Sequence, residues 1–320
     1  MPGSYIVAGA RTPIGKLGGS LAGFSATDLG GFAIKAALAR AGIAPEAVEY
    51  VYMGQVLQAG AGQITARRAA VNAGIPMTTP ASTINKVCLS GLNTIFLADQ
   101  LISSGYADVV VAGGMESMTN APYLLPGARA GFRAGDQTLV DSMMYDGLFC
   151  AFDSCAMGAA TERDTAVARI SRDAQDEFSA RSHELAAIAH KEGRFVDELV
   201  SVEVPQRKGD PLLVEVDEGV RPGTTAASLG GLKPAFAAGG TVTAGNASQI
   251  SDGGSAVVMV SKAYAERLGV TPLGEVVGYG QIAGPDTSLL TQPSRAIRHA
   301  LSRTELTVAD IEQYEINEAF

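Results

Sequence analysis

Short apolar runs and longer amphipathic stretches alternate along the first 120 residues of the chain. The short runs are rich in β-branched residues and predict strands, at residues 5–10, 48–56, 82–87 and 108–112. The longer stretches predict helices, at residues 27–41, 63–73 and 89–104. A chain that alternates strands and helices in this order is typical of a mostly parallel sheet with helices on both faces.

The pattern of the first half returns near the end of the chain. Residues 33–40 align without gaps with residues 296–303, an offset of 263 residues from position 33 to position 296. A strand-like run precedes both segments, at residues 5–10 and 275–280. Self-similarity of this kind predicts two similar halves. In the second half only four residues follow the strand predicted at 311–316, so we expect this half to be incomplete.

A long segment separates the two halves. It contains a helix predicted at residues 171–192, which Ser171 opens as N-cap and Gly193 closes. Glycine-rich and proline-rich stretches around this helix suit loops over a ligand site. The predicted division of the chain is an N-terminal half, a loop domain and a C-terminal half, at residues 1–119, 120–241 and 242–320.

Composition and charge argue against several kinds of binding partner. The formal net charge is −9 and no long basic run occurs, which argues against nucleic acid as a partner. No apolar stretch approaches the ~20 residues that span a bilayer, and the N-terminus does not resemble a signal peptide. We therefore expect a cytoplasmic protein without a membrane partner. The three cysteines form no Cys/His cluster, so we expect no metal site.

Cys88 carries the clearest chemical signal in the sequence. It lies between the strand predicted at 82–87 and the helix predicted at 89–104. Free backbone N–H groups and the helix dipole favour negative charge at such a turn. A cysteine in this setting is a candidate thiolate nucleophile. The alternative is that Cys88 is a small buried apolar residue.

Six stretches together carry a resemblance to a known family. They are residues 10–15 (Ala-Arg-Thr-Pro-Ile-Gly), 61–67, 85–92 around Cys88, 113–118 (Gly-Gly-Met-Glu-Ser-Met), 241–248 (Thr-Val-Thr-Ala-Gly-Asn-Ala-Ser) and 317–320 (Asn-Glu-Ala-Phe). In this order they resemble the thiolases, that is the acetyl-CoA acetyltransferases and 3-ketoacyl-CoA thiolases. The resemblance runs over nearly the whole chain.

The resemblance implies a fold and an activity. The fold is α/β, with five layers (α/β/α/β/α) built from two similar halves, together with a loop domain that binds coenzyme A. The activity is that of an acyl-CoA C-acyltransferase, which forms or cleaves 3-ketoacyl-CoA through an acyl thioester on Cys88. Within the family, the resemblance favours the activity of an acetyl-CoA acetyltransferase. Acyl-CoA and coenzyme A are substrate and product, and no other cofactor is implied.

The resemblance also implies roles for individual residues. Cys88 is the nucleophile, and Asn317 holds the water that stabilises the enolate oxygen of the second substrate. The residues implied in coenzyme A binding are Leu148, Met157, Arg221, Phe236, Ala244 and Ser248. Among these, Arg221 is expected near the adenine nucleotide, and Met157, Phe236, Ala244 and Ser248 along the pantetheine channel. The segment 125–148 resembles the loop through which short-chain members form homotetramers.

The chain departs from the family pattern at several positions. The family carries a His in a Gly-His-Pro motif and a second Cys after the Asn-Glu-Ala-Phe motif, so both are expected beyond Phe320. His183, His190 and His299 lie on predicted helices and are expected to be ordinary helical histidines. The 320 residues are therefore expected to lack the activating His and the condensation base. Ala156 also replaces a His that short-chain members often carry, which leaves an acetoacetyl-CoA preference open.

Two other functions remain as alternatives. The chain could be a non-catalytic or truncated acyl-CoA-binding subunit in which Cys88 is vestigial, although such a subunit need not keep Asn317. It could also be a β-ketoacyl synthase, which has a similar fold. That alternative is weaker because β-ketoacyl synthases lack the long loop domain.

Overall fold

The computed structural model describes residues 3–320, which fall into two compact units. The first unit contains the chain up to Gly147, Phe195–Gly219 and Ile250–Val276. The second unit contains Leu148–Arg194, Val220–Gln249 and Val277–Phe320.

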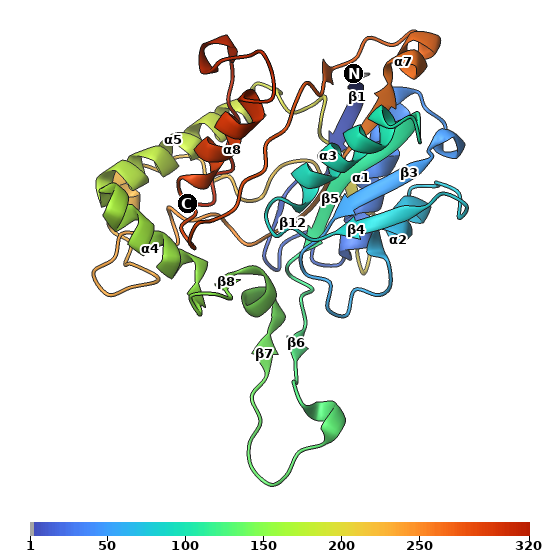
Figure 1. Cartoon of the computed structure of the whole chain (residues 1–320). Coiled ribbons are helices and arrows are strands. Elements are labelled where there is room, and N and C mark those ends of the chain that lie inside the picture. The colour runs from blue at the N-terminus through green and yellow to red at the C-terminus, as the bar shows by residue number, and fades with distance from the viewer. Residues whose placement is uncertain (1–2) are drawn as a thin grey trace. The chain divides into compact units, whose positions relative to one another are not determined.

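A seven-stranded mixed sheet forms the centre of the first unit (Figure 1). Its strands are β1 (Ser4–Arg11), β2 (Gly15–Lys16), β3 (Tyr50–Gly54), β4 (Ala81–Ile84), β5 (Val109–Ser117), β12 (Ser251–Ser261) and β13 (Gly274–Glu275). The strand order is β13-β1-β12-β5-β3-β4, and β2 pairs with one end of β12. β4 and β5 both pair with β3 in parallel, as predicted.

The prediction of a mostly parallel sheet is wrong for the other side of this sheet. β12 enters between β1 and β5 and is antiparallel to both. β13 is also antiparallel to β1. The pattern of the first 120 residues could not reveal this arrangement, because the inserted strand comes from more than 130 residues further along the chain.

Helices cover both faces of the sheet (Figure 1). They are α1 (Ala26–Ala41), α2 (Thr65–Asn72), α3 (Ser90–Ser103) and the short α7 (Lys262–Leu268). α1 and α2 pack on one face and α3 on the other, because alternate residues of β5 point to opposite sides. Val109 and Val111 lie in a buried cluster with Ile34 of α1, whereas Val110 and Ala112 lie in a cluster with Ala98 of α3.

Two further segments belong to the first unit. β10 (Val202–Val204) and β11 (Leu212–Val214) form a hairpin, and Arg11 ties this part of the chain to β1 through ion pairs with Glu198 and Asp217 at 2.6 and 2.7 Å. Residues 119–147 form an arm that extends away from the sheet (Figure 1). The arm contains β6 (Tyr123–Leu124), β7 (Val140–Asp141), a 3₁₀ turn and a π-helical turn.

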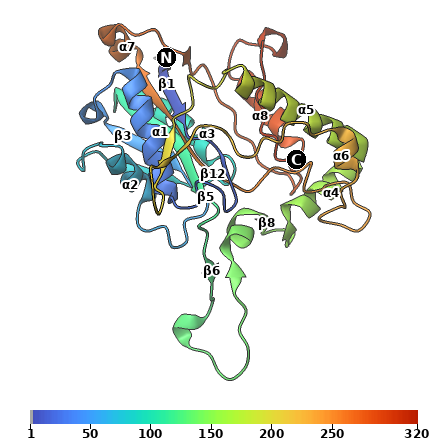
Figure 2. The same cartoon turned by 180° about the vertical axis from the view of Figure 1, so that it is seen from behind.

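Helices and a short hairpin make up the second unit. The elements are β8 (Phe149–Cys150), β9 (Cys155–Ala156), α4 (Met157–Ala168), α5 (Arg172–Lys191), α6 (Ala226–Gly230) and α8 (Gln292–Leu301). The Ser171 hydroxyl accepts the N–H of Ala174, so the predicted N-cap of α5 is confirmed. α6 packs against α5 (Figure 2).

The internal repeat is visible in the helices but not in the strands. α8 matches α1 at the predicted offset. The strand predicted at 275–280 is reduced to β13, and the strand predicted at 311–316 does not form. Within the described residues, 277–320 contain no strand at all. A strand needs a hydrogen-bonded neighbour, and neither segment has one beyond the Gly274–Glu275 pairing with β1.

The boundaries at residues 119 and 241 stay a prediction. β12, which follows the second of them, is part of the first unit's sheet. None of the helices described between residues 3 and 320 is both long and apolar enough to cross a membrane.

Candidate active site

Cys88 lies in a tight turn that joins β4 to α3, as the sequence predicts. The N–H groups of Leu89 and Ser90 donate to the carbonyls of Lys86 and Val87 at 3.1 and 3.0 Å. Val87 has a φ of +49°, a conformation that β-branched residues rarely adopt. The Cys88 thiol is free and exposed directly before the first turn of α3, so the alternative of a buried apolar cysteine is wrong.

Two polar side chains hold this turn in place. The buried Ser90 hydroxyl donates to the carbonyl of Val87 at 2.6 Å and accepts the N–H of Lys86 at 2.8 Å. The Asn85 amide accepts the N–H of Val87 at 3.0 Å and donates to the carbonyl of Val56 at 3.3 Å. A sparsely populated backbone conformation persists only where its surroundings fix it. These bonds fix the thiol on the outside of the turn.

The Gly-Gly-Met-Glu-Ser-Met motif supports the same region from β5. The Glu116 carboxylate accepts the N–H groups of Val56 and Leu57 at 2.8 and 3.2 Å. Burial raises the pKa of Glu116 above its ordinary value, although these two hydrogen bonds oppose the shift. Glu116 and Asn85 therefore both anchor the loop after β3 at Val56, next to the Cys88 turn.

The other seven predicted site residues belong to the second unit. Leu148 and Met157 are joined by a backbone hydrogen bond of 2.9 Å across the β8–β9 hairpin. The Phe236 ring lies directly over Gly158, where an added Cβ would come within 2.4 Å of it. Phe236 also packs edge-to-face against Phe320, with ring centroids 6.4 Å apart. The start of α4, Phe236 and the segment ending at Phe320 thus form one apolar cluster.

The 241–248 motif contacts the segment that ends at Phe320. The Ser248 N–H donates to the carbonyl of Ala319 at 3.0 Å. Asn317 is exposed and lines a hollow of about 370 Å³. The other residues around this hollow are Phe178, Tyr314, Glu315, Ile316, Glu318 and Phe320. Ala244 is exposed as well, on the turn that Asn246 closes by accepting the N–H of Thr243.

Arg221 is exposed in the loop before α6. Its N–H donates to Nδ1 of His183 on α5 at 3.2 Å, so His183 has a specific partner that the sequence did not predict. Burial and the Arg221 charge lower the pKa of His183, while Glu318 opposes the shift. The neutral ring that this favours is the form that can accept the Arg221 N–H.

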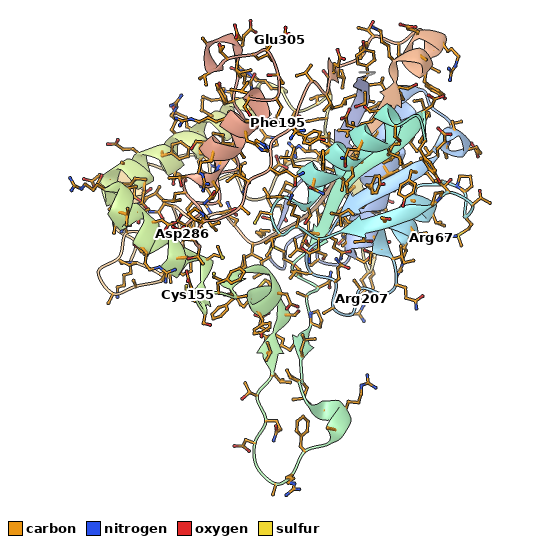
Figure 3. All side chains as sticks on the ribbon, viewed as in Figure 1. Arg67, Cys155, Phe195, Arg207, Asp286 and Glu305 are labelled. Atoms are coloured by element: carbon orange, nitrogen blue, oxygen red, sulfur yellow. The ribbon has the colours of Figure 1, made fainter. Side chains whose placement is uncertain are left out.

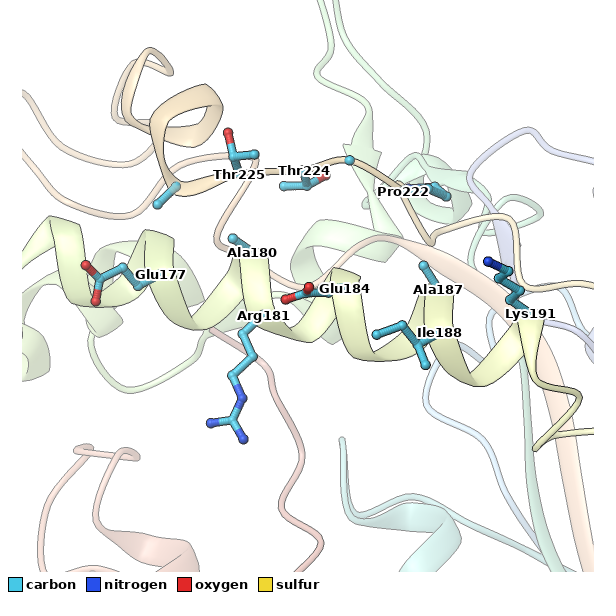
Figure 4. Close-up of a pocket in the computed structure, with 12 residues that line it drawn as sticks. Glu177, Ala180, Arg181, Glu184, Ala187, Ile188, Lys191, Pro222, Thr224 and Thr225 are labelled. Atoms are coloured by element: carbon cyan, nitrogen blue, oxygen red, sulfur yellow. The ribbon is translucent and has the colours of Figure 1, made fainter.

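A larger hollow is lined by the residues that directly follow Arg221. It measures about 760 Å³ and lies between α5 and residues 222–226 (Figure 4). Ala180 and Ala187 face the loop, whereas Arg181 points away from it (Figure 4). Across residues 3–320, no group of three or more His, Cys, Asp or Glu side chains is placed to hold a metal ion.

Glu162 is a residue of this region that sequence reasoning missed. It lies on α4, and its carboxylate accepts the N–H groups of Thr241 at 2.8 Å and Val242 at 2.7 Å, together with the Thr241 hydroxyl at 3.0 Å. It therefore fixes the start of the 241–248 motif against α4. A glutamate in the middle of a helix carries no local signal for such a contact.

Replacing Glu162 by glutamine is expected to loosen the 241–248 motif. The glutamate carboxylate offers two acceptor oxygens to these donors, whereas the glutamine amide offers only one. We therefore expect a loss of about 1–3 kcal/mol in the free energy of unfolding. Urea unfolding of the purified chain measures this loss. Glu46→Gln, at an exposed position, is the matched control and should leave stability unchanged. Equal stability of the two variants would contradict a role of Glu162 in fixing the 241–248 motif.

Two family models match the chain. A model of the thiolase N-terminal domain matches residues 4–263, and a model of the thiolase C-terminal domain matches residues 270–320.

Individual relatives match over almost the full length of the chain. The probable acetyl-CoA acetyltransferase of Mycolicibacterium smegmatis is 57% identical over 315 residues, which are 98% of this chain and 81% of the relative. The acetyl-CoA acetyltransferase of Cupriavidus necator is 52% identical over 316 residues, 98% of this chain and 80% of the relative. The crystal structure of the Bacillus anthracis acetyl-CoA acetyltransferase matches 100% of this chain and 81% of its own, with a TM-score of 0.96 and 37% identity.

Proposed function

Since this chain belongs to the thiolase family, we propose that it is an acetyl-CoA acetyltransferase whose acyl group is carried on Cys88. The thiolase fold expected from the sequence is confirmed over the whole chain. The names of relatives that are 46–57% identical support acetyl-CoA as the substrate. The family assignment also sets aside the β-ketoacyl synthase alternative.

One observation carries the proposal: an exposed thiol in a rigid turn at the start of α3. The Cys88 thiolate attacks the carbonyl carbon of the acyl thioester, and coenzyme A leaves as its thiol. The acyl group stays on Cys88, so one difficult transfer becomes two easier ones. The oxyanion formed in each step needs a fixed donor. The turn already uses the N–H groups of Leu89 and Ser90, and we assign this role to the N–H of Cys88.

The second unit supplies the groups for coenzyme A. We propose that Leu148, Met157 and Phe236 form the apolar wall along the pantetheine arm, with Ala244 and Ser248 on its other side. The contacts of Phe236 with Phe320 and of Ser248 with Ala319 support this. Asn317 holds the water for the enolate oxygen of the second substrate.

We place the adenine nucleotide beside Arg221. Arg221 is exposed and directly precedes residues 222–226, which line the hollow beside α5, and a guanidinium is well suited to pair with phosphate. The lowered pKa of His183 keeps its ring available to hold the Arg221 backbone.

The arm at residues 119–147 supports a homotetramer. It exposes five large apolar side chains, Tyr123, Leu125, Phe132, Leu139 and Tyr145. Exposed apolar groups concentrated on one segment are typical of a protein interface. We propose that this arm joins copies of the chain, and sedimentation velocity of the purified protein tests it. A cytoplasmic location stays a prediction of the sequence.

The acyl-enzyme is the direct test of the function. The purified chain is incubated with acetyl-CoA, the released coenzyme A thiol is measured, and the intact mass is followed. We expect the mass to grow by one acetyl group, and peptide mapping to find that group on Cys88 rather than on Cys150 or Cys155. Tight binding of acetyl-CoA without any acetyl adduct would instead favour the non-catalytic acyl-CoA-binding subunit.

A further inference from the structure

The remaining two cysteines face each other across a hairpin. Cys150 of β8 and Cys155 of β9 are register partners in an antiparallel pair. The four-residue turn between them includes Ser154, with a φ of +52°. The proposed acyl transfer uses neither thiol.

The Cα spacing of the pair falls within the range that a disulfide spans. Hydrogen-bonded and non-hydrogen-bonded pairs alternate along an antiparallel ladder. The backbone bond from Met157 to Leu148 makes that pair hydrogen-bonded, so Cys150 and Cys155, two positions along, are hydrogen-bonded as well. The Cα atoms of such a pair lie about 5.5 Å apart, within the roughly 4.4–6.8 Å that a disulfide spans.

Both thiols are accessible to an oxidant and have polar neighbours. Both cysteines are half-buried, so a small oxidant can reach them. The Asp153 N–H donates to Sγ of Cys150 at 3.5 Å. The Arg163 guanidinium interacts with the Cys155 thiol and with the Asp153 carboxylate.

The turn that separates the cysteines is itself anchored. Asp153 pairs with Arg163 of α4 and accepts the Thr287 hydroxyl at 2.6 Å. Anchoring on both sides keeps the two strands in register, so the thiols stay opposite each other. Cys155 lies on β9 immediately before α4 (Figure 3).

We propose that Cys150 and Cys155 form a reversible disulfide that controls how the β8–β9 hairpin presents Leu148 and Met157. The hairpin begins directly after Leu148 and ends directly before Met157, both of which we assign to the pantetheine wall. Closing the bond draws the two Sγ atoms together and fixes the hairpin in one twist. The binding part of this inference rests on the proposed function.

Hydrogen peroxide is a sufficient oxidant. The Cys155 thiolate attacks the O–O bond, which breaks to leave a sulfenic acid and one water. The Cys150 thiolate then attacks the sulfenic sulfur, so that an S–S bond forms, the S–O bond breaks and a second water leaves. In total, the two thiols lose two protons and two electrons, and one peroxide becomes two waters. A dithiol reductant reverses the reaction.

The test for the bond uses the full chain with Cys88→Ser, because only Cys150 and Cys155 then remain as thiols. The protein is treated with hydrogen peroxide, alkylated with iodoacetamide and cut with a protease that cleaves before Asp153. We expect a mass loss of two hydrogens, no alkylation, and two peptides that separate only after reduction. Cys150→Ser in the same background should give no linked peptides. Full alkylation of both thiols after peroxide, or linkage between chains, would overturn the proposal.

The test for control of binding uses desulfo-coenzyme A, which has no thiol to reduce the disulfide. We expect the oxidised chain to bind it about tenfold more weakly, the effect of a small apolar misfit, and dithiothreitol to restore the affinity. In the same Cys88→Ser background, the affinity of the Cys150→Ser variant should not respond to peroxide. A disulfide with unchanged affinity would overturn the control of binding. A linked pair in a chain that never binds desulfo-coenzyme A would support the thiol pair and overturn the proposed coenzyme A site instead.

Discussion

The Cys88→Ser variant is expected to lose acetylation by acetyl-CoA by at least about 10³-fold, because the thiolate is replaced by a hydroxyl that is a poor nucleophile at its ordinary pKa. The side chain is exposed and differs by one atom, so the fold and the affinity for desulfo-coenzyme A should not change. Intact mass measured over time after mixing with acetyl-CoA gives the acetylation rate. Calorimetry on the same preparation gives the affinity.

The matched control for Cys88 is Cys150→Ser. It removes a half-buried thiol that has no part in the proposed transfer, and it should be acetylated at the rate of the unchanged chain. Acetylation that survives in Cys88→Ser would place the acyl group on another residue and overturn the assignment. Loss of both acetylation and binding in that variant would point to a damaged fold.

The sequence predicted the setting of Cys88 because the signals are local. A β-branched run, a cysteine and an apolar helix within about 20 residues place the thiol at a strand-to-helix turn. The positive φ of Val87 and the hydrogen bond from the Ser90 hydroxyl to Val87 could not be predicted from these local signals. The turn is also tied to the loop after β3 through Asn85 and the Val56 carbonyl, which only the folded chain brings together.

The errors in the predicted fold have a common cause. Helix α8 was found because the hydrogen bonds and the amphipathic pattern of a helix lie within one segment. The strands predicted at 275–280 and 311–316 required neighbours that their sequences cannot specify. β12 shows the converse, since its antiparallel place between β1 and β5 depends on strands far away in the sequence. Glu162 was missed for the same reason, because its partners lie 79 and 80 residues away.

Replacing Gly54 by alanine is expected to displace the start of α3 and the thiol that precedes it. A Cβ at Gly54 would lie 2.5 Å from the Gly91 nitrogen and 2.5 Å from the carbonyl carbon of Ser90. These are backbone atoms, so the helix must shift rather than a side chain. Overpacking of this kind costs about 1–3 kcal/mol in the free energy of unfolding. Urea unfolding measures that cost, and the rate of Cys88 acetylation measures the displacement.

The neighbouring Gly91→Ala variant is the control for Gly54→Ala. It replaces a glycine by alanine at a position where the added Cβ has room. A Cβ at Gly91 would meet its nearest atom, the Gly114 Cα, at 3.7 Å, an ordinary contact. Neither Gly54 nor Gly91 has a positive φ, so backbone strain does not distinguish them. Alanine at Gly91 should therefore leave acetylation intact and stabilise the chain by about 0.4–1 kcal/mol, since the unfolded state loses freedom. If Gly54→Ala proved as stable and as reactive as Gly91→Ala, the close approach of α3 to β3 would not be what positions Cys88.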